Sequence, residues 1–305
     1  MLGVGLIGGS IGLAARRRLG AHVVGYDPDA AVLSSAGELG AIDEAASGLS
    51  AAVKHADAVF VASPVGASTQ VVRRALEAAG AECVVSDVGS TKREIVAAIS
   101  DPRFVGGHPL AGAETAGVGH AREDLFDGAT WYVTPVAGAA RSAAGPSALT
   151  GASTLPVVES APWALERLRG LTEGIGARPI AIDPEAHDRL MAGVSHLPHV
   201  LANVLVAQAI RAVESDGAAV ADGALGAGPS FRDATRVAGA NTAIWTDIYM
   251  SNRDLLGHAL DHAIAELGTV REALDAGNAQ ALAAWNERAR AAHEQLQRAG
   301  LAPGS

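Results

Sequence analysis

The sequence predicts an α/β domain with a doubly wound sheet, followed by an all-helical domain. Two observations carry this prediction. Up to about residue 182, short apolar runs alternate with helical patterns, an order typical of a parallel sheet with helices on both faces. From Pro184 onward no strand-like run follows, and long helical patterns take over. We therefore expect one domain over residues 1–182 and a helical domain over residues 183–305.

The first domain contains seven apolar runs of strand length, and helical patterns such as Gly9–Leu19 and Gly66–Ala79 lie between them. A stretch rich in small residues, about residues 136–156, interrupts the alternation, and we predict that it is an inserted surface loop. The predicted strands are Met1–Ile7, His22–Tyr26, Ala58–Ala62, Cys83–Ser86, Phe104–Gly107, Thr130–Thr134 and Arg178–Ile182.

The second domain is predicted to consist of long helices. Between residues 253 and 274, apolar side chains recur at steps of three and four residues, which places them on one helix face. Asn278 is predicted to cap the last helix. Such broad apolar faces favour packing against a second copy of the chain, so we expect a homodimer through this domain; a monomeric bundle stays open. The predicted helices are Glu185–Val194, Pro198–Glu214, Trp245–Leu274 and Asn278–Ala299.

Composition argues against several classes of protein. The net charge of −10 does not suit a nucleic-acid binder, which normally carries a basic face. No segment reaches the roughly 18 apolar residues of a membrane span, and no signal peptide precedes the first motif, so a cytoplasmic protein is expected. Cys83 is the single cysteine and is predicted to be a buried strand residue, so neither a disulfide within the chain nor a metal site is expected.

The first apolar run leads into Gly3-Val4-Gly5-Leu6-Ile7-Gly8, a G-x-G-x-x-G sequence that opens a helical pattern. Such a turn holds a dinucleotide pyrophosphate at the helix N-terminus. Asp27 ends the second run, 19 residues after Gly8, where a carboxylate binds the ribose and repels a 2′-phosphate. The sequence therefore predicts a Rossmann-like domain that binds NAD rather than NADP. The residues assigned to the cofactor are Gly3, Gly5, Leu6, Ile7, Gly8, Asp27, Ser63 and Pro64.

Only two residues precede Gly3, which is short for a central strand. Whether the natural chain begins upstream therefore stays open. This observation bears on the stability of the domain more than on its function.

Two further segments, Asp87–Lys92 and His108–Gly112, follow neighbouring predicted strands. The carboxyl ends of parallel strands meet at one edge of the sheet, so we expect both segments beside the nicotinamide. His108 precedes a proline and lies between glycines, so it is predicted to sit on a constrained loop. A merely structural, hydrogen-bonded histidine is the alternative interpretation.

Taken together, the segments resemble the prephenate and arogenate dehydrogenases. The resemblance covers about residues 3 to 255, and the combination is far more specific than any one motif. It is carried by Gly3–Ser10, Asp87–Lys92, His108–Glu114, His187-Asp188, Ser195–His199, Phe231–Ala238 and Trp245.

The resemblance implies NAD-dependent oxidative decarboxylation of prephenate to 4-hydroxyphenylpyruvate, a step of tyrosine biosynthesis. His108 then matches the general base that accepts the C4 hydroxyl proton, a role suited to a pKa near neutrality. Ser90 matches the serine that orients this hydroxyl. Arg236 matches the arginine that pairs with a substrate carboxylate. The other substrate-binding residues that the resemblance implies are His199, Ser195 and Glu114.

Alternatives stay open at several points. The enzyme could act on arogenate instead, and feedback inhibition by tyrosine is undecided. A non-catalytic NAD-binding module would not need His108, Ser90 and Arg236 together. The β-hydroxyacid dehydrogenases use a lysine of the helical domain, and no lysine follows residue 92. His187 and His196 are interpreted as structural, and a structural ion pair is the alternative for Arg236.

Overall fold

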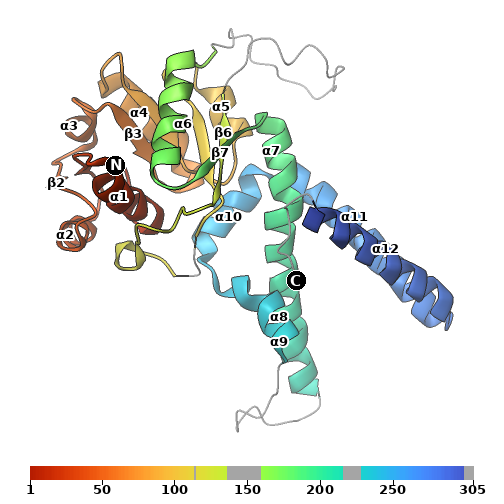
Figure 1. Cartoon of the computed structure of the whole chain (residues 1–305). Coiled ribbons are helices and arrows are strands. Elements are labelled where there is room, and N and C mark those ends of the chain that lie inside the picture. Colours follow the sequence, from red (N-terminus) through yellow and green to blue (C-terminus); the bar gives the residue numbers. More distant parts are fainter. Residues whose placement is uncertain (113–114, 136–158, 216–227, 299–305) are drawn as a thin grey trace. The chain divides into compact units, whose positions relative to one another are not determined.

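Three strand ladders of the first domain are joined by single bridges into one open sheet (Figure 1). The computed structural model describes residues 1–112, 115–135, 159–215 and 228–298, so the predicted loop at 136–156 lies outside the described residues. The strands are β1 (Val24–Gly25), β2 (Glu44–Ala45), β3 (Ala58–Val61), β4 (Val84–Asp87), β5 (Gly106–Pro109), β6 (Thr130–Thr134) and β7 (Arg178–Ala181).

The strand predicted at Met1–Ile7 is wrong in its extent, because α1 already begins at Leu6. Leu2 alone bridges Tyr26 on one side and Val61 on the other, both in parallel register. Its N–H donates to Phe60 O at 2.9 Å, and its carbonyl accepts from Ala62 N at 2.7 Å. A single residue thus holds the central place between β1 and β3.

The sheet is parallel from β2 through β5, but β6 pairs with β5 in antiparallel register. The prediction of a uniformly parallel sheet therefore fails at this edge. Among the described residues, only the short 3₁₀ turn η1 (Val118–His120) lies between β5 and β6, and without a crossover helix β6 can run back along β5. β7 runs parallel to β6 because α6 (Pro162–Gly174) provides a crossover between them.

Successive residues of the central strands are buried on opposite faces of the sheet. Val59 and Val61 of β3 pack into one cluster and Phe60 into another, and Val85 and Val84 of β4 divide in the same way. Burial on both faces produces the continuous apolar runs of the sequence. The covering helices are α1 (Leu6–Leu19), α2 (Ala30–Leu39), α3 (Leu49–Val53), α4 (Val65–Ala78), α5 (Arg93–Ala98) and α6.

A long helical stretch follows β7. It comprises α7 (Pro184–Met191), the π-helical turn η3 (Ala192–His196) and α8 (Leu197–Ser215). In the π turn, Leu197 N–H donates to the carbonyl of Ala192, five residues earlier. Pro198 lacks an N–H, so one donor of the ordinary ladder is missing at the point where the stretch widens. Turns of this kind are frequent at functional sites.

The helix predicted over Trp245–Leu274 is wrong as a single helix. The structure has α10 (Thr242–Ser251) and α11 (Arg253–Asp275), separated by Asn252 at φ −122° and ψ 26°. The Asn252 side chain is fully buried in hydrogen bonds described below, and these tertiary contacts override helix periodicity. The remaining helical elements are α9 (Pro229–Thr235), the 3₁₀ turn η5 (Arg236–Gly239) and α12 (Ala279–Arg298).

The chain divides into two compact units, Met1–Arg253 and Asp254–Ser305. In the second unit, α11 and α12 are joined by a turn in which Asn278 Oδ1 accepts from Ala281 N at 3.0 Å, so the predicted cap is confirmed. Cys83 is buried with a free thiol, which confirms its predicted burial.

Candidate active site

The glycine-rich turn has three glycines with three different surroundings. Gly3 has φ +86°, and a Cβ there would lie 2.4 Å from Ala62 O. A Cβ on Gly8 would lie 2.0 Å from the carbonyl oxygen of Gly3. A Cβ on Gly5 would meet nothing within 4 Å. The fold itself thus requires Gly3 and Gly8, whereas the space at Gly5 is of the kind that a pyrophosphate needs to approach the backbone. These residues fit a dinucleotide.

Asp27 lies directly beside this turn. Its Oδ2 accepts from Val4 N and its Oδ1 from Asp29 N, each at 3.0 Å. The carboxylate is therefore held against the turn, where an adenosine ribose would reach it. Ser63 and Pro64 follow β3 on the other side of the turn: a Cβ on Gly3 would lie 3.5 Å from Ser63 N, and Pro64 is the residue that precedes α4. Leu6 and Ile7 form the first turn of α1, as a pyrophosphate site at this helix N-terminus requires.

The loop that carries Ser90 is fixed by a buried ion pair. Lys92 Nζ pairs with Asp87 Oδ2, and both side chains are at most 1% exposed. Asp87 also accepts from Gly89 N at 2.8 Å and from Gly107 N at 3.2 Å, which ties the end of β4 to β5. Ser90, half-buried, thus lies between two anchored residues next to the strand of His108.

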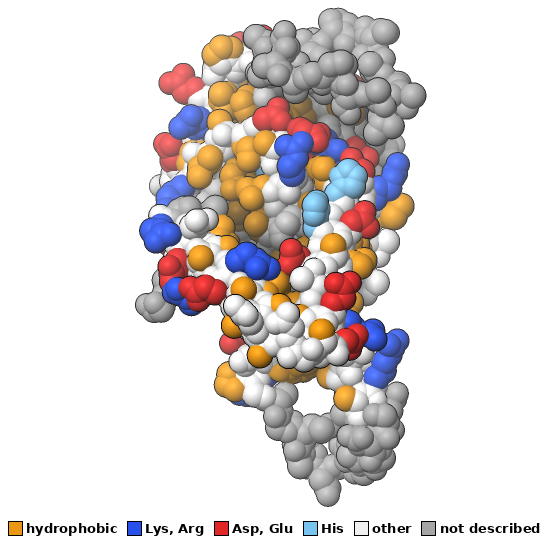
Figure 2. Space-filling model, turned by 90° about the vertical axis from the view of Figure 1, so that its right-hand side faces the viewer, with side chains coloured by type: hydrophobic (Ala, Val, Ile, Leu, Met, Phe, Trp, Pro, Cys, Tyr) orange, Lys and Arg blue, Asp and Glu red, His pale blue; other side chains and the backbone are white. Residues whose placement is uncertain are grey.

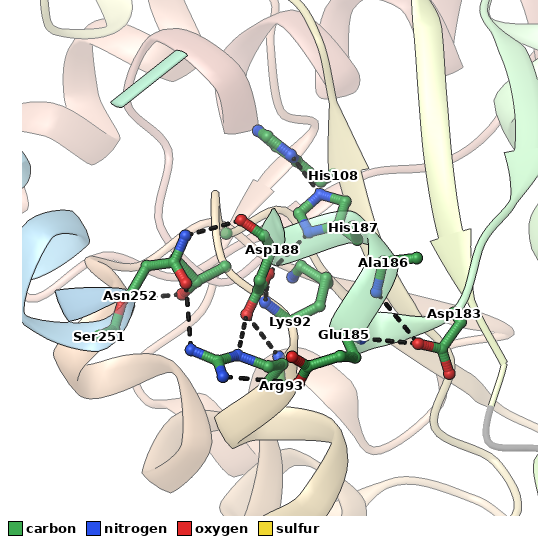
Figure 3. Close-up of polar contacts among 12 residues, drawn as sticks. Lys92, Arg93, His108, Asp183, Glu185, Ala186, His187, Asp188, Ser251 and Asn252 are labelled. Carbon is green, nitrogen blue, oxygen red and sulfur yellow. Dashed lines mark hydrogen bonds and ion pairs between the residues drawn. The ribbon is translucent and has the colours of Figure 1, made fainter. Parts of the chain in front are cut away.

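His108 is part of a chain of three buried side chains (Figure 3). Its Nδ1 lies 2.9 Å from Nε2 of His187, and Nδ1 of His187 lies 2.7 Å from Asp188 Oδ1. His108 is 8% exposed and the other two are fully buried. His108 belongs to β5, paired with Tyr132, and not to a loop as predicted. A strand position fixes its backbone more firmly than a loop would.

Asp188 is surrounded by donors from three segments. Its Oδ1 accepts from Lys92 N at 2.7 Å, and its Oδ2 accepts from Arg93 N at 2.9 Å and from Arg93 Nε at 3.3 Å. Asn252 donates to its carbonyl at 2.8 Å and lies 3.1 Å from Nδ1 of His196. The start of α5 is thus joined to α7 through the carboxylate of Asp188, and the break after α10 through its backbone carbonyl (Figure 3).

Burial lowers the pKa of His108 well below the ordinary value of 6.5, and the neighbouring His187, Lys92 and His196 lower it further. The expectation of a pKa near neutrality is therefore wrong. The imidazole is neutral at physiological pH, the form that can accept a proton. Burial raises the pKa of Asp188, but hydrogen bonds from His187 and from the Arg93 and Lys92 backbone outweigh it and bring the pKa below its ordinary value.

The other predicted substrate residues gather around a second imidazole. His199 is buried and stacks on Trp245, with ring centroids 3.6 Å apart. Its Nδ1 contacts the hydroxyl of Tyr249. Ser195 lies one turn earlier and is half-buried. Arg236 is exposed at the start of η5, and the backbone of the next residue faces His199.

The structure places the predicted site residues in three groups: the glycine-rich turn with Asp27, the edge with Ser90 and His108, and the surroundings of His199. No described contact joins Arg236 to His108, and Glu114 lies outside the described residues. His196 links the last two groups electrostatically, because it lowers the pKa of His108 and its own pKa is lowered by His199.

Sequence reasoning missed the partners of His108. His187 was interpreted as structural, yet it contacts the predicted base directly. Lys92, Asp188 and Asn252 were not assigned a role in the site. An adjacent His-Asp pair was the only available signal, and it does not say which distant side chain it meets.

Comparison with known proteins decides the family. The profile "Prephenate dehydrogenase, nucleotide-binding domain" matches residues 11–143, and "Prephenate dehydrogenase, dimerization domain" matches residues 183–287. A prephenate dehydrogenase of Bacillus subtilis is 34% identical over 92% of this chain and 71% of its own length. The chain belongs to the prephenate dehydrogenase family.

Other family members agree with this assignment. A cyclohexadienyl dehydrogenase of Zymomonas mobilis is 30% identical over 90% of this chain and 87% of its own length. The crystal structure of a putative prephenate dehydrogenase from Corynebacterium glutamicum, 29% identical, has a TM-score of 0.75 and covers 96% of this chain and 88% of its own.

The fold agrees as well. The Aquifex aeolicus prephenate dehydrogenase in complex with hydroxyphenyl propionate and NAD⁺ has a TM-score of 0.78 at 24% identity, over 97% of this chain and 96% of its own. The predicted family and the order of a nucleotide-binding domain and a helical domain are confirmed, and with them the prediction of an NAD-dependent dehydrogenase.

Proposed function

We propose that this prephenate dehydrogenase family member oxidises prephenate to 4-hydroxyphenylpyruvate with NAD as the oxidant. The observation that carries the proposal is the buried, neutral His108 beside the Ser90 loop, at the same sheet edge as the glycine-rich turn. When bound, NAD supplies the acceptor for the hydride that leaves C4. Gly3, Gly5 and Asp27 would hold its pyrophosphate and ribose.

The reaction requires the chain to accept one proton from the substrate and to return it to the product. As C4 loses hydride, Nε2 of His108 accepts the C4 hydroxyl proton, so that a carbonyl forms in place of a protonated ketone. The ring carboxylate then leaves as CO₂, and the electrons of the broken bond restore an aromatic ring. The resulting phenolate oxygen takes the proton back from His108. No acid or metal is needed for the decarboxylation, because aromatisation drives it.

The remaining side chains bind and orient the substrate. We assign Ser90 to the C4 hydroxyl and Arg236 to a substrate carboxylate, which a guanidinium can pair with at both oxygens. His199, held by Trp245 and Tyr249, and Ser195 would face the substrate side chain. The family resemblance also assigns Glu114 to the substrate.

Arogenate is the second candidate substrate, and the Zymomonas mobilis relative named cyclohexadienyl dehydrogenase favours keeping it. The two substrates differ at the side chain, a keto group against an ammonium group. Steady-state measurement of NADH formation with each substrate tests the proposal. We expect a higher kcat/KM for prephenate; a higher value for arogenate would select the alternative, and no NADH with either would overturn the function.

We also propose that the chain consists of a nucleotide-binding domain over residues 1–182 and a helical domain over residues 183–305. We propose that the helical domain joins two copies of the chain in a homodimer. The match to a dimerization domain supports it. So does α8, where large apolar side chains remain exposed, namely Leu201, Val204, Leu205, Val206 and Ile210. Residues 184–212 have the length and hydropathy of a membrane span, a weak sign by itself, and this stretch also contains buried histidines and Asp188. A partner subunit would cover its apolar face.

We further propose a cytoplasmic protein whose partner molecules are NAD and its substrate, and not a nucleic acid. On the face drawn in Figure 2, the described Lys and Arg side chains are scattered among acidic ones and do not form a basic patch. The net charge of −10 agrees with this distribution.

A further inference from the structure

The mechanism above uses His108 but leaves its neighbours His187 and Asp188 unexplained. Both are fully buried on α7, at the start of the helical part of the chain, while His108 lies on β5. The rings of the two histidines meet edge to face, with centroids 5.1 Å apart. A histidine that acts as a general base through one particular nitrogen needs a neighbouring group that holds its own proton on the other nitrogen.

The proton positions can be worked out from Asp188. This carboxylate can only accept hydrogen bonds, and it already receives two backbone N–H groups and Arg93 Nε. The 2.7 Å contact with His187 must therefore be donated by the histidine. The proton of His187 is fixed on Nδ1.

The balance of buried charge then decides the state of His187. Asp188 is paired with the guanidinium of Arg93, and Asp87 is paired with Lys92. Arg93 also reaches the half-exposed Glu185 at 3.5 Å, so Arg93 and Lys92 already place two cations beside these carboxylates. An imidazolium at the fully buried His187 would add a third cation, at a high desolvation cost. In the neutral ring with its proton on Nδ1, Nε2 carries a lone pair and can accept a hydrogen bond.

We infer that His187, oriented by Asp188, accepts a hydrogen bond from Nδ1–H of His108 and so leaves Nε2 of His108 free as the base. The 2.9 Å contact between the two rings needs one proton, and only His108 can supply it. His187 and Asp188 are positioning residues, because they act through His108. Without them a neutral His108 could carry its proton on either nitrogen, and the tautomer protonated at Nε2 cannot act as the base.

The inference deepens the proposed function and rests on it for its catalytic consequence. When His108 holds the substrate proton, its Nδ1–H still faces Nε2 of His187, so the hydrogen bond and the orientation of the ring are kept until the proton returns to the phenolate. The tautomer itself, however, can be observed without any substrate.

Nitrogen NMR of protein labelled with ¹⁵N-histidine, with NAD bound at pH 7.5, tests the tautomer. The signals of His108 are those missing from His108→Asn. We expect the wild-type signal of a neutral ring protonated at Nδ1. In His187→Leu we expect a shift toward the ring protonated at Nε2, and kcat about 100-fold lower at an unchanged Kd for NAD. His196→Leu is the matched control, since it removes another buried imidazole that has no hydrogen bond to His108, and it should keep the wild-type tautomer.

A wild-type His108 protonated at Nε2 overturns the inference, and this spectrum needs no variant to fold. A tautomer unchanged in a folded His187→Leu protein overturns it as well. If neither prephenate nor arogenate is oxidised, the proposed function fails while the spectra still decide the tautomer.

Discussion

The glycine-rich turn and the histidine chain are the two functional regions of this molecule, and they are built in opposite ways. The turn uses backbone groups of residues 3–8, a continuous stretch, with one carboxylate placed beside it. The histidine chain joins side chains of β5 and α7 to backbone N–H groups at the start of α5, and the contact between its two histidines links residues 79 positions apart. A contiguous site depends on local sterics, whereas a dispersed one depends on every element that brings a partner. Substitutions in the two regions should therefore differ in their effects on turnover, folding and cofactor binding.

His108→Asn should have the largest effect on turnover. Asparagine cannot accept the substrate proton, and a positioned general base contributes about 10²–10⁴-fold. We expect kcat to fall at least 100-fold, with an unchanged thermal unfolding temperature and Kd for NAD, measured by calorimetry. Near-normal kcat would show that the base is another residue, with His199 the next candidate.

The pH profile sharpens the same test. Burial lowers the pKa of His108, and His187 from α7, Lys92 after β4 and His196 from η3 lower it further. Only the neutral form accepts a proton, so kcat should stay constant through pH 6.5 and fall at more acidic pH. This acid limb should be absent from the residual activity of His108→Asn. The same limb in both proteins would assign it to a different group.

Alanine substitutions at two glycines should separate folding from cofactor binding in the turn. In Gly8→Ala the new Cβ would lie 2.0 Å from a backbone oxygen that cannot move aside, so we expect the free energy of unfolding to fall by about 3 kcal/mol. Gly5→Ala meets nothing within 4 Å and has an ordinary φ of −75°. It should fold normally yet bind NAD at least about tenfold more weakly. Wild-type NAD affinity in Gly5→Ala would contradict the proposed pyrophosphate site.

Arg236→Ala should affect the substrate alone. The side chain is exposed, so stability should change little, whereas loss of a charge partner for the carboxylate should raise the KM for prephenate at least about tenfold. The Kd for NAD should stay the same. An unchanged KM together with a lower unfolding temperature would show that Arg236 has a structural role.

Asp27→Ala should have the smallest and most specific effect. In the wild type we expect NAD to be preferred over NADP by more than about tenfold in kcat/KM, because a carboxylate beside a 2′-phosphate costs more than about 1.4 kcal/mol. The substitution should lower the ratio of kcat/KM for NAD to kcat/KM for NADP. Equal use of both cofactors by the wild type would refute the assignment of Asp27.

The difference between the two regions explains which predictions succeeded. The helices that begin at residues 65 and 197 and most strands could be predicted from the spacing of apolar residues. An element that is buried on one or both faces needs apolar side chains at regular positions along the chain. The antiparallel direction of β6, the two-residue strand β2 and the break at Asn252 were not. Each depends on a hydrogen-bond partner far away in the chain, and local secondary-structure propensity does not identify that partner.

The sequence by itself determined the fold class and, through resemblance, the family, and it singled out the glycine-rich turn with Asp27 and His108 as the candidate site residues. These features lie in short stretches whose residue types are dictated by backbone geometry or by the reaction. The tertiary structure decided the rest: that His108 lies in a strand, that burial and nearby charges lower its pKa, and that His187 and Asp188 stand behind it. A side chain's protonation and hydrogen bonds are set by whichever groups surround it in space, and folding alone brings residues 92, 108 and 188 together.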